Sequence, residues 1–134
     1  MAFDNPLASE IWSSKYRFTP PGEAAEESIE ATWDRVAAAL AAAEASPLRE
    51  GMRARFRQAL ADFRFLPGGR IIAGAGTARS VTLFNCFVMG RVPDDLGGIF
   101  DHVRQAAVTL QQGGGVGMDF STVKLNDLFR DKQT

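Results

Sequence analysis

The sequence predicts a helix-rich α+β fold in which a helical hairpin precedes the first strands of a sheet. Apolar residues recur at helical spacing in two segments, about 24–45 and 48–63, and a β-branched and aromatic run follows at 80–89. With 134 residues, 46% of them hydrophobic, the chain is long enough for one ordinary domain. The later order of strand, helix, glycine turn and strand is typical of a βαβ unit with a helical preface.

The first 23 residues form a mixed segment in which aromatic side chains stand among polar ones. The aromatic residues are Trp12, Tyr16 and Phe18, and the segment closes with Thr19-Pro20-Pro21-Gly22. We expect this segment to be an arm that packs against the rest of the chain, with its aromatic residues as packing anchors.

Two helices are predicted next. The Ala-rich stretch from about Ala24 to Ala45 places its apolar residues on one stripe, which consists of Ile29, Trp33, Val36 and Leu40. Ser46-Pro47 supplies an N-cap and a first-turn proline for the second helix. The buried face predicted for that helix consists of Leu48, Met52, Phe56, Leu60 and Phe63. The short link favours an antiparallel pair.

A glycine-rich segment ends the hairpin and leads into a strand. Helix-breaking residues at 66–70 introduce 71–77, which we predict as a short apolar strand or extended loop. The run from Ser80 to Met89 predicts a strand. Alternation places Thr82, Phe84, Cys86 and Val88 on one face, opposite Val81, Leu83, Asn85 and Phe87. Because both faces are mostly apolar, we expect an interior strand in which Cys86 is buried.

Pro93-Asp94-Asp95 predicts the start of a third helix, whose acidic first turn suits the positive end of the helix dipole. Its apolar stripe consists of Leu96, Ile99, Phe100, Val103, Ala107 and Leu110. The glycines at 113–115 end this helix and lead into a short strand at about 116–120. So small a sheet would leave its edges open and its faces uncovered, which indicates the opening of a larger structure.

Charge and cysteine content exclude several classes of function. The chain has 15 Lys and Arg against 16 Asp and Glu, so it lacks the basic surface of a general nucleic-acid or membrane-surface binder. One cysteine, no signal peptide and no membrane-length apolar run predict a protein of the reducing cytoplasm. His102 has no companion at ligand spacing, so we expect no metal site. The single thiol is either chemically idle or acts with residues outside this chain.

Four motifs follow one another at characteristic spacing. They are Ile11-Trp12-Ser13-Ser14-Lys15-Tyr16-Arg17-Phe18; Phe65-Leu66-Pro67-Gly68-Gly69-Arg70 with Ala73-Gly74-Ala75-Gly76-Thr77; Phe84-Asn85-Cys86-Phe87-Val88; and Asp94-Asp95-Leu96 with Ile99-Phe100 and the run 113–121. Each motif alone is weak. Together, over residues 11–122, they resemble the N-terminal part of a ribonucleotide reductase catalytic subunit of the adenosylcobalamin-dependent type.

The resemblance implies a ten-stranded α/β barrel in which a thiyl radical abstracts a hydrogen from the ribose and a cysteine pair delivers two electrons. Cys86 matches one member of that redox pair, and its partner is absent from this chain. The resemblance also implies adenosylcobalamin as the cofactor of the full-length family. Taken without the family, Cys86 would be interpreted as an idle buried thiol.

Two groups of binding residues are expected. Gly69, Gly114 and Gly115 are candidate substrate contacts, because turns without side chains let backbone amides approach a ligand; ordinary loops are the alternative. Asn85, the neighbour of Cys86, is the fourth candidate substrate contact. The second group matches the region where dimeric family members bind a deoxynucleoside triphosphate effector and pair helices, and it consists of Asp94, Asp95, Leu96 and Ile99. We therefore expect the chain to form a homo-oligomer through the helix at 94–112. In the alternative interpretation Asp94 caps the helix, Asp95 is solvated, and the two apolar residues belong to the core.

The resemblance divides the chain into an arm and helical domain at 1–65, the start of the barrel with the effector helix at 66–122, and a divergent polar tail at 123–134. The family's second redox cysteine, thiyl cysteine, catalytic Glu and Asn, and cobalamin contacts are missing, so we expect the chain alone not to reduce ribonucleotides. The alternative is a non-catalytic nucleotide-binding or dimerisation module that partners a full-length reductase.

Overall fold

The computed structural model describes residues 3–124, which divide into two units on either side of the Leu83–Phe84 bond. This division falls within the segment 66–122 that the sequence treats as one domain. Most of the predicted polar tail at 123–134 lies outside the described residues. The predicted helix-rich α+β class is confirmed, whereas the ten-stranded barrel stays a prediction.

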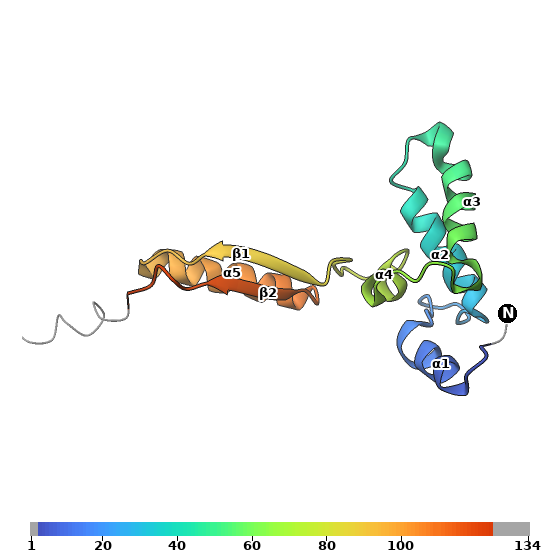
Figure 1. The fold of residues 1–134 in the computed structure, drawn as a ribbon, viewed down its shortest axis with the longest axis horizontal. Helices are drawn as coiled ribbons and strands as arrows, with labels where there is room; N and C mark the ends of the chain where they lie inside the picture. Colours follow the sequence, from blue (N-terminus) through green and yellow to red (C-terminus); the bar gives the residue numbers. More distant parts are fainter. Residues whose placement is uncertain (1–2, 125–134) are drawn as a thin grey trace, which may run out of the picture. The chain divides into compact units, whose positions relative to one another are not determined.

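The described part of the first unit contains helices joined by turns and loops, and no strand. The arm contributes a short helix and a π-helical turn; two longer helices, α2 and α3, follow side by side (Figure 1). In chain order the elements are α1 (Pro6–Ile11), η1 (Trp12–Tyr16), α2 (Ile29–Ala41), η2 (Ser46–Leu48), α3 (Arg49–Leu60), η3 (Ala61–Phe63) and α4 (Gly69–Gly74). The predicted helical hairpin is therefore present, with α2 shorter at both ends than the Ala-rich stretch.

The core of this unit lies where α2 meets the arm, α3 and α4. It is built from Trp12, Ile29, Trp33, Val36, Ala37, Leu60, Ile72 and Ala75. The predicted α2 stripe is confirmed, with Leu40 only half-buried. The predicted α3 face is correct only in part, because Leu60 is buried whereas Leu48 and Phe63 are exposed. Ser46 lies inside the 3-10 turn η2 and does not act as the cap of α3.

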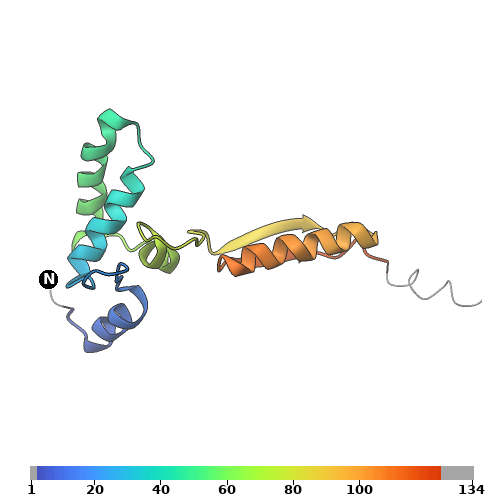
Figure 2. The same cartoon turned by 180° about the vertical axis from the view of Figure 1, so that it is seen from behind.

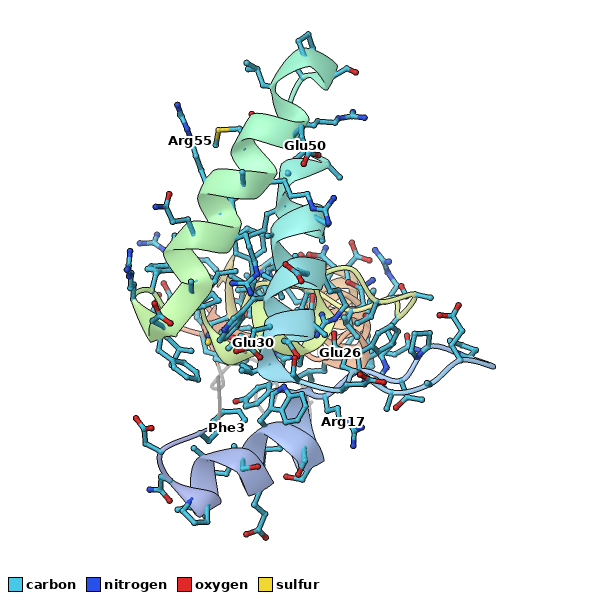
Figure 3. The ribbon with its side chains drawn as sticks, turned by 90° about the vertical axis from the view of Figure 1, so that its right-hand side faces the viewer. Phe3, Arg17, Glu26, Glu30, Glu50 and Arg55 are labelled. Carbon is cyan, nitrogen blue, oxygen red and sulfur yellow. The ribbon has the colours of Figure 1, made fainter. Side chains whose placement is uncertain are left out.

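A hydrogen-bonded chain of polar groups joins the arm to α2. Trp12 Nε1 donates to Thr32 Oγ1 (2.9 Å), and the fully buried Thr32 hydroxyl donates to Glu26 Oε2 (2.6 Å). Glu26 also accepts from Phe18 N, and its backbone carbonyl accepts from Arg17 Nε near the start of α2 (Figure 3). Each buried polar group in this series of hydrogen bonds has a partner, so hydrogen bonds as well as packing fix the arm in position.

The prediction of a strand or extended loop at 71–77 is wrong for residues 71–74, because Gly69–Gly74 forms the helix α4; residues 75–77 lie outside the helix. The reason is tertiary. Ile72 is buried in the helical core, and Arg35 Nη2 and Nη1 of α2 donate to the carbonyls of Ile72 (3.0 Å) and Ala75 (2.5 Å). A short helix whose terminal carbonyls are satisfied by an arginine tolerates its glycines.

The second unit is a parallel βαβ arrangement, as the sequence predicts. Strands β1 (Cys86–Arg91) and β2 (Gly115–Asp119) pair in parallel, with Cys86 opposite Gly115, and α5 (Leu96–Gln111) connects them. Figures 1 and 2 both show α5 running along one face of this pair. The first strand begins at Cys86 rather than near Ser80, because Val81 and Leu83 pack instead against Gly74 of α4.

The exposure of the two faces differs from the predicted pattern. On β1, Phe87 and Met89 are half-buried against α5, whereas Cys86 and Val88 are exposed. On α5 the residues turned inward are Ile99, His102, Ala106 and Thr109. Most of the apolar stripe predicted for this helix is exposed, namely Leu96, Phe100, Val103, Ala107 and Leu110. The apolar residues follow helical spacing, but one helix packed on two strands covers only one face of each element.

Candidate functional site

Cys86 lies on the uncovered face of the two-stranded sheet. It is the first residue of β1, pairs in register with Gly115, and is exposed. The expectation that Cys86 is buried is therefore wrong for the described chain, because α5 covers only the opposite face. The strand assignment itself is confirmed.

Small residues surround the thiol on this open face. A Cβ built on Gly115 would lie 3.6 Å from Cys86 Sγ, and one built on Gly117 would have nothing within 4 Å. Val88, opposite Gly117 in the register, is 93% exposed. The open face thus presents a thiol beside glycine backbone, an arrangement that allows a ligand to approach both.

The other predicted substrate residues of this unit meet at the same end of the sheet. The carbonyl of Asn85 accepts a hydrogen bond from Gly115 N (2.8 Å), which places Asn85 next to the thiol. Gly114 has a structural reason to be glycine, since an added Cβ would lie 2.7 Å from Phe87 Cε2 and 2.8 Å from Thr109 Cγ2. Gly114 is buried, so it lets α5 pack closely on β1.

Gly69 belongs to the first unit, at the start of α4. A Cβ built there would lie 3.0 Å from Tyr16 Oη, so packing of the arm on α4 also favours glycine. Gly69 is thus the one predicted substrate residue outside the cluster around Cys86 in the second unit.

The predicted effector residues gather where β1 ends and α5 begins. Asp95 is the N-cap of α5, with Oδ1 accepting from Gly98 N (2.8 Å), while Asp94 Oδ1 accepts from Lys124 N (3.1 Å). The alternative in which Asp94 caps the helix is therefore wrong by one residue. Leu96 is 69% exposed and Ile99 is half-buried, so only Ile99 packs as core.

An ion pair and a backbone hydrogen bond join the ends of β1 and β2 next to these residues. Arg91 Nε lies 3.2 Å from Asp119 Oδ2, and Val92 N donates to the carbonyl of Asp119 (2.9 Å). The backbone N–H of Ser121, with help from its side chain and Arg91, holds the pKa of Asp119 below its ordinary value. The hydroxyl of Thr122 also donates to the carbonyl of Val92.

The thiol cluster and the aspartates lie at opposite ends of β1. The strand runs from Cys86 to Arg91, and at about 3.3 Å per residue it separates them by more than the reach of one side chain. The structure therefore brings Asn85, Cys86, Gly114 and Gly115 together and keeps them apart from the predicted effector residues.

Sequence reasoning missed the residues that position the helical unit. Glu26, Thr32 and Arg35 form one network: Arg35 Nε lies 2.7 Å from Glu26 Oε1. The available signal was a Thr and an Arg three residues apart on one face of α2. Among residues 3–124 no three His, Cys, Asp or Glu side chains are grouped as metal ligands, and no helix is long and apolar enough to cross a membrane.

Residues 2–80, more than half of the chain, match the family model described as the ribonucleotide reductase all-alpha domain. The chain belongs to the ribonucleotide reductase family. The matched residues cover almost all of the helical unit, whose described residues contain helices and turns but no strand.

Individual reductases agree with this assignment. The ribonucleoside-diphosphate reductase subunit alpha of Helicobacter pylori is 35% identical over 69 residues, 52% of this chain and 8% of that protein. A Mycobacterium phage D29 protein is 27% identical over 128 residues, 96% of this chain and 18% of its own length. It is named a putative adenosylcobalamin-dependent ribonucleoside-triphosphate reductase. The chain thus spans less than a fifth of the length of these curated relatives.

Proposed function

We propose that the chain is the N-terminal portion of a ribonucleotide reductase catalytic subunit, with Cys86 as one member of the redox pair. The observation that carries this proposal is the position of Cys86: an exposed thiol at the start of a parallel strand, beside Gly115, on a sheet face that α5 leaves uncovered. In a reductase family member, a thiol there is accessible to a bound ribonucleotide.

The chemistry assigned to Cys86 requires a second thiol from outside the chain. Ribonucleotide and two thiols give deoxyribonucleotide, water and one disulfide: the C2′–O bond breaks, a C2′–H bond forms and the sulfurs are joined. With one cysteine, this chain supplies one of the two sulfurs. We therefore expect it to be inactive alone and active only with the remainder of the subunit.

Adenosylcobalamin is proposed for the full-length enzyme, on the strength of the phage relative's name. Among the described residues no three His, Cys, Asp or Glu side chains are grouped so that they could hold a metal ion. His102 Nδ1 lies 3.2 Å from the carbonyl of Gly98 within α5. We therefore place the cofactor contacts in other parts of the enzyme and assign none to this chain.

We propose that the start of α5 is the effector end of the unit. Asp94, Leu96 and Ile99 lie next to the capped N-terminus, and carboxylates there would contact ribose or base, because a triphosphate would be repelled. The exposed apolar stripe on α5 would then pair with a second subunit, since so much exposed apolar surface marks an interaction site.

The alternative is a non-catalytic module that binds nucleotide or partners a full-length reductase. The same exposed α5 stripe favours it, because a partner could cover this stripe without any use of Cys86. Gly115 favours the reductase proposal instead, because it leaves room for a substrate beside the Cys86 sulfur, which a binding module does not need.

A complementation experiment separates the two proposals. The chain is expressed with the downstream remainder of the subunit, and deoxyribonucleotide formation is measured with an external dithiol as reductant. The Cys86→Ser variant should lose turnover while nucleotide binding by the same sample is unchanged. Full turnover by Cys86→Ser would refute the redox assignment. No activity in any combination, together with retained deoxynucleotide binding, would support the module.

A further inference from the structure

A small cavity beside α4 contains two arginines and no acid. It has a volume of about 150 Å³, and its lining includes Gly69, Arg70, Ala73, Gly74, Arg79 and Val81. None of these side chains is a carboxylate, so the cavity is positively charged at neutral pH.

Neither arginine has an acidic partner within residues 3–124. Other arginines of this part of the chain are neutralised: Arg35 by Glu26 at 2.7 Å and Arg57 by Asp34 at 2.6 Å. Arg70 is half-buried without a side-chain hydrogen bond, and the Arg79 guanidinium lies 6.0 Å from the centre of the Phe18 ring. Two like charges in one small cavity repel each other unless an anion lies between them.

The walls of the cavity are fixed by packing. A Cβ on Gly74 would lie 2.9 Å from Val81 Cγ2 and 3.2 Å from Leu83 Cδ2, so the segment after α4 folds closely back on it. Arg35 holds the carbonyl end of α4 through Ile72 and Ala75. The segments that carry the two arginines are therefore held together before any ligand arrives, which lowers the entropic cost of binding.

We infer that Arg70 and Arg79 bind a phosphate oxyanion in this cavity. Planar guanidinium groups donate paired hydrogen bonds to phosphate oxygens. The volume admits one phosphate-sized group, whereas sites for drug-sized ligands are about 300 Å³ or larger. The oxyanion is either free phosphate or the phosphate of a nucleotide whose nucleoside stays outside the cavity. This inference is independent of the redox role proposed for Cys86.

The test is a titration of inorganic phosphate into the isotope-labelled 134-residue chain at constant ionic strength, with chloride as the compensating anion. The amide signals of Gly69, Ala73 and Gly74 should shift with a saturable dependence on phosphate. Arg70→Gln and Arg79→Gln should each weaken the apparent Kd about tenfold. Arg55→Gln is the matched control, because Arg55 is exposed and projects from α3 away from α2 (Figure 3), and it should leave the Kd unchanged.

Competition identifies the source of the oxyanion. Displacement of phosphate by ADP but not by adenosine would support a nucleotide phosphate, and failure of ADP to compete would support free phosphate. Arg79 is exposed, so Arg79→Gln tests the site even where Arg70→Gln disturbs the fold. Non-saturable shifts, or equal Kd values for Arg79→Gln and Arg55→Gln, would overturn the inference. Neither result bears on Cys86, so this failure and that of the proposed function remain distinguishable.

Discussion

Arg35 and Glu26 form the ion pair that organises the helical unit. The guanidinium Nε lies 2.7 Å from Glu26 Oε1, and the two side chains are only 10% and 9% exposed. From this position Arg35 also donates to two carbonyls of the α4 segment, while Glu26 accepts from Thr32 and from Phe18 N. One ion pair therefore connects the arm, α2 and α4.

Replacing Glu26 should destabilise the helical unit. Glu26→Gln leaves a nearly buried Arg35 without its counter-charge, and we expect a loss of about 2 kcal/mol in the free energy of unfolding at neutral pH. Urea denaturation followed by circular dichroism measures the loss. Glu27→Gln, at an exposed neighbour, is the control and should change little. An equal loss in both variants would show that the ion pair does not organise the unit.

The same carboxylate should make stability depend on pH. Burial by itself would raise the pKa of Glu26, but hydrogen bonds from Arg35, Thr32 and Phe18 N outweigh it and hold the pKa below the ordinary value of 4.5. Glu26 thus contributes stability that is complete above pH 4.5 and is lost as the pH falls through the folded-state pKa. The free energy of unfolding, measured at several pH values across this range, should depend less on pH for Glu26→Gln than for the natural chain. An identical pH dependence in both chains would count against the network.

Gly114 should be far less tolerant of a methyl group than Gly117. Gly114→Ala brings its Cβ within 2.7 Å of Phe87 and 2.8 Å of Thr109, so we expect a cost of about 1–3 kcal/mol. At Gly117 the added Cβ meets nothing within 4 Å, and the same substitution should be nearly neutral. Amide hydrogen exchange in α5 and β1 reports the difference. Similar protection in both variants would argue that Gly114 is not needed for packing.

Removal of the Asp95 cap should loosen the start of α5. Asp95→Ala loses the bond to Gly98 N, which costs about 1 kcal/mol, while Asp95→Asn keeps an acceptor and should keep most of the stability. Faster exchange of the first-turn amides, seen in Asp95→Ala alone, is the expected result. A larger effect from Asp94→Ala would contradict the assignment of Asp95 as the cap.

The Cys86 thiol should react in the folded chain without denaturant. Because Cys86 is exposed, a thiol reagent is expected to modify one equivalent per chain, and Cys86→Ser should give none. Gly115→Val places bulk where a Cβ would lie 3.6 Å from Sγ, so it should slow labelling severalfold, whereas Gly117→Val should not. Labelling that requires denaturant would show that the open sheet face is covered.

The element types were largely predictable from local pattern. Apolar residues repeat every three to four positions in α2, and Gly113, whose φ is +85°, ends α5 at the expected place. The parallel pairing of β1 with β2 follows from a helical connection of this length between two strands. The β-branched and aromatic run at 80–89 likewise predicts a strand, and Cys86 is the first residue of β1.

Sequence alone thus determined the apolar stripe of α2, the βαβ order and the family, because each of these depends on residues close together along the chain. Only the tertiary structure decided that 69–74 is a helix, that Asp95 rather than Asp94 is the cap, and that Cys86 faces outward. Those outcomes depend on partners distant in sequence: Arg35 binds the α4 carbonyls, and α5 covers one sheet face and leaves the other open. Periodicity shows that a stripe is apolar, but only packing decides whether anything covers it.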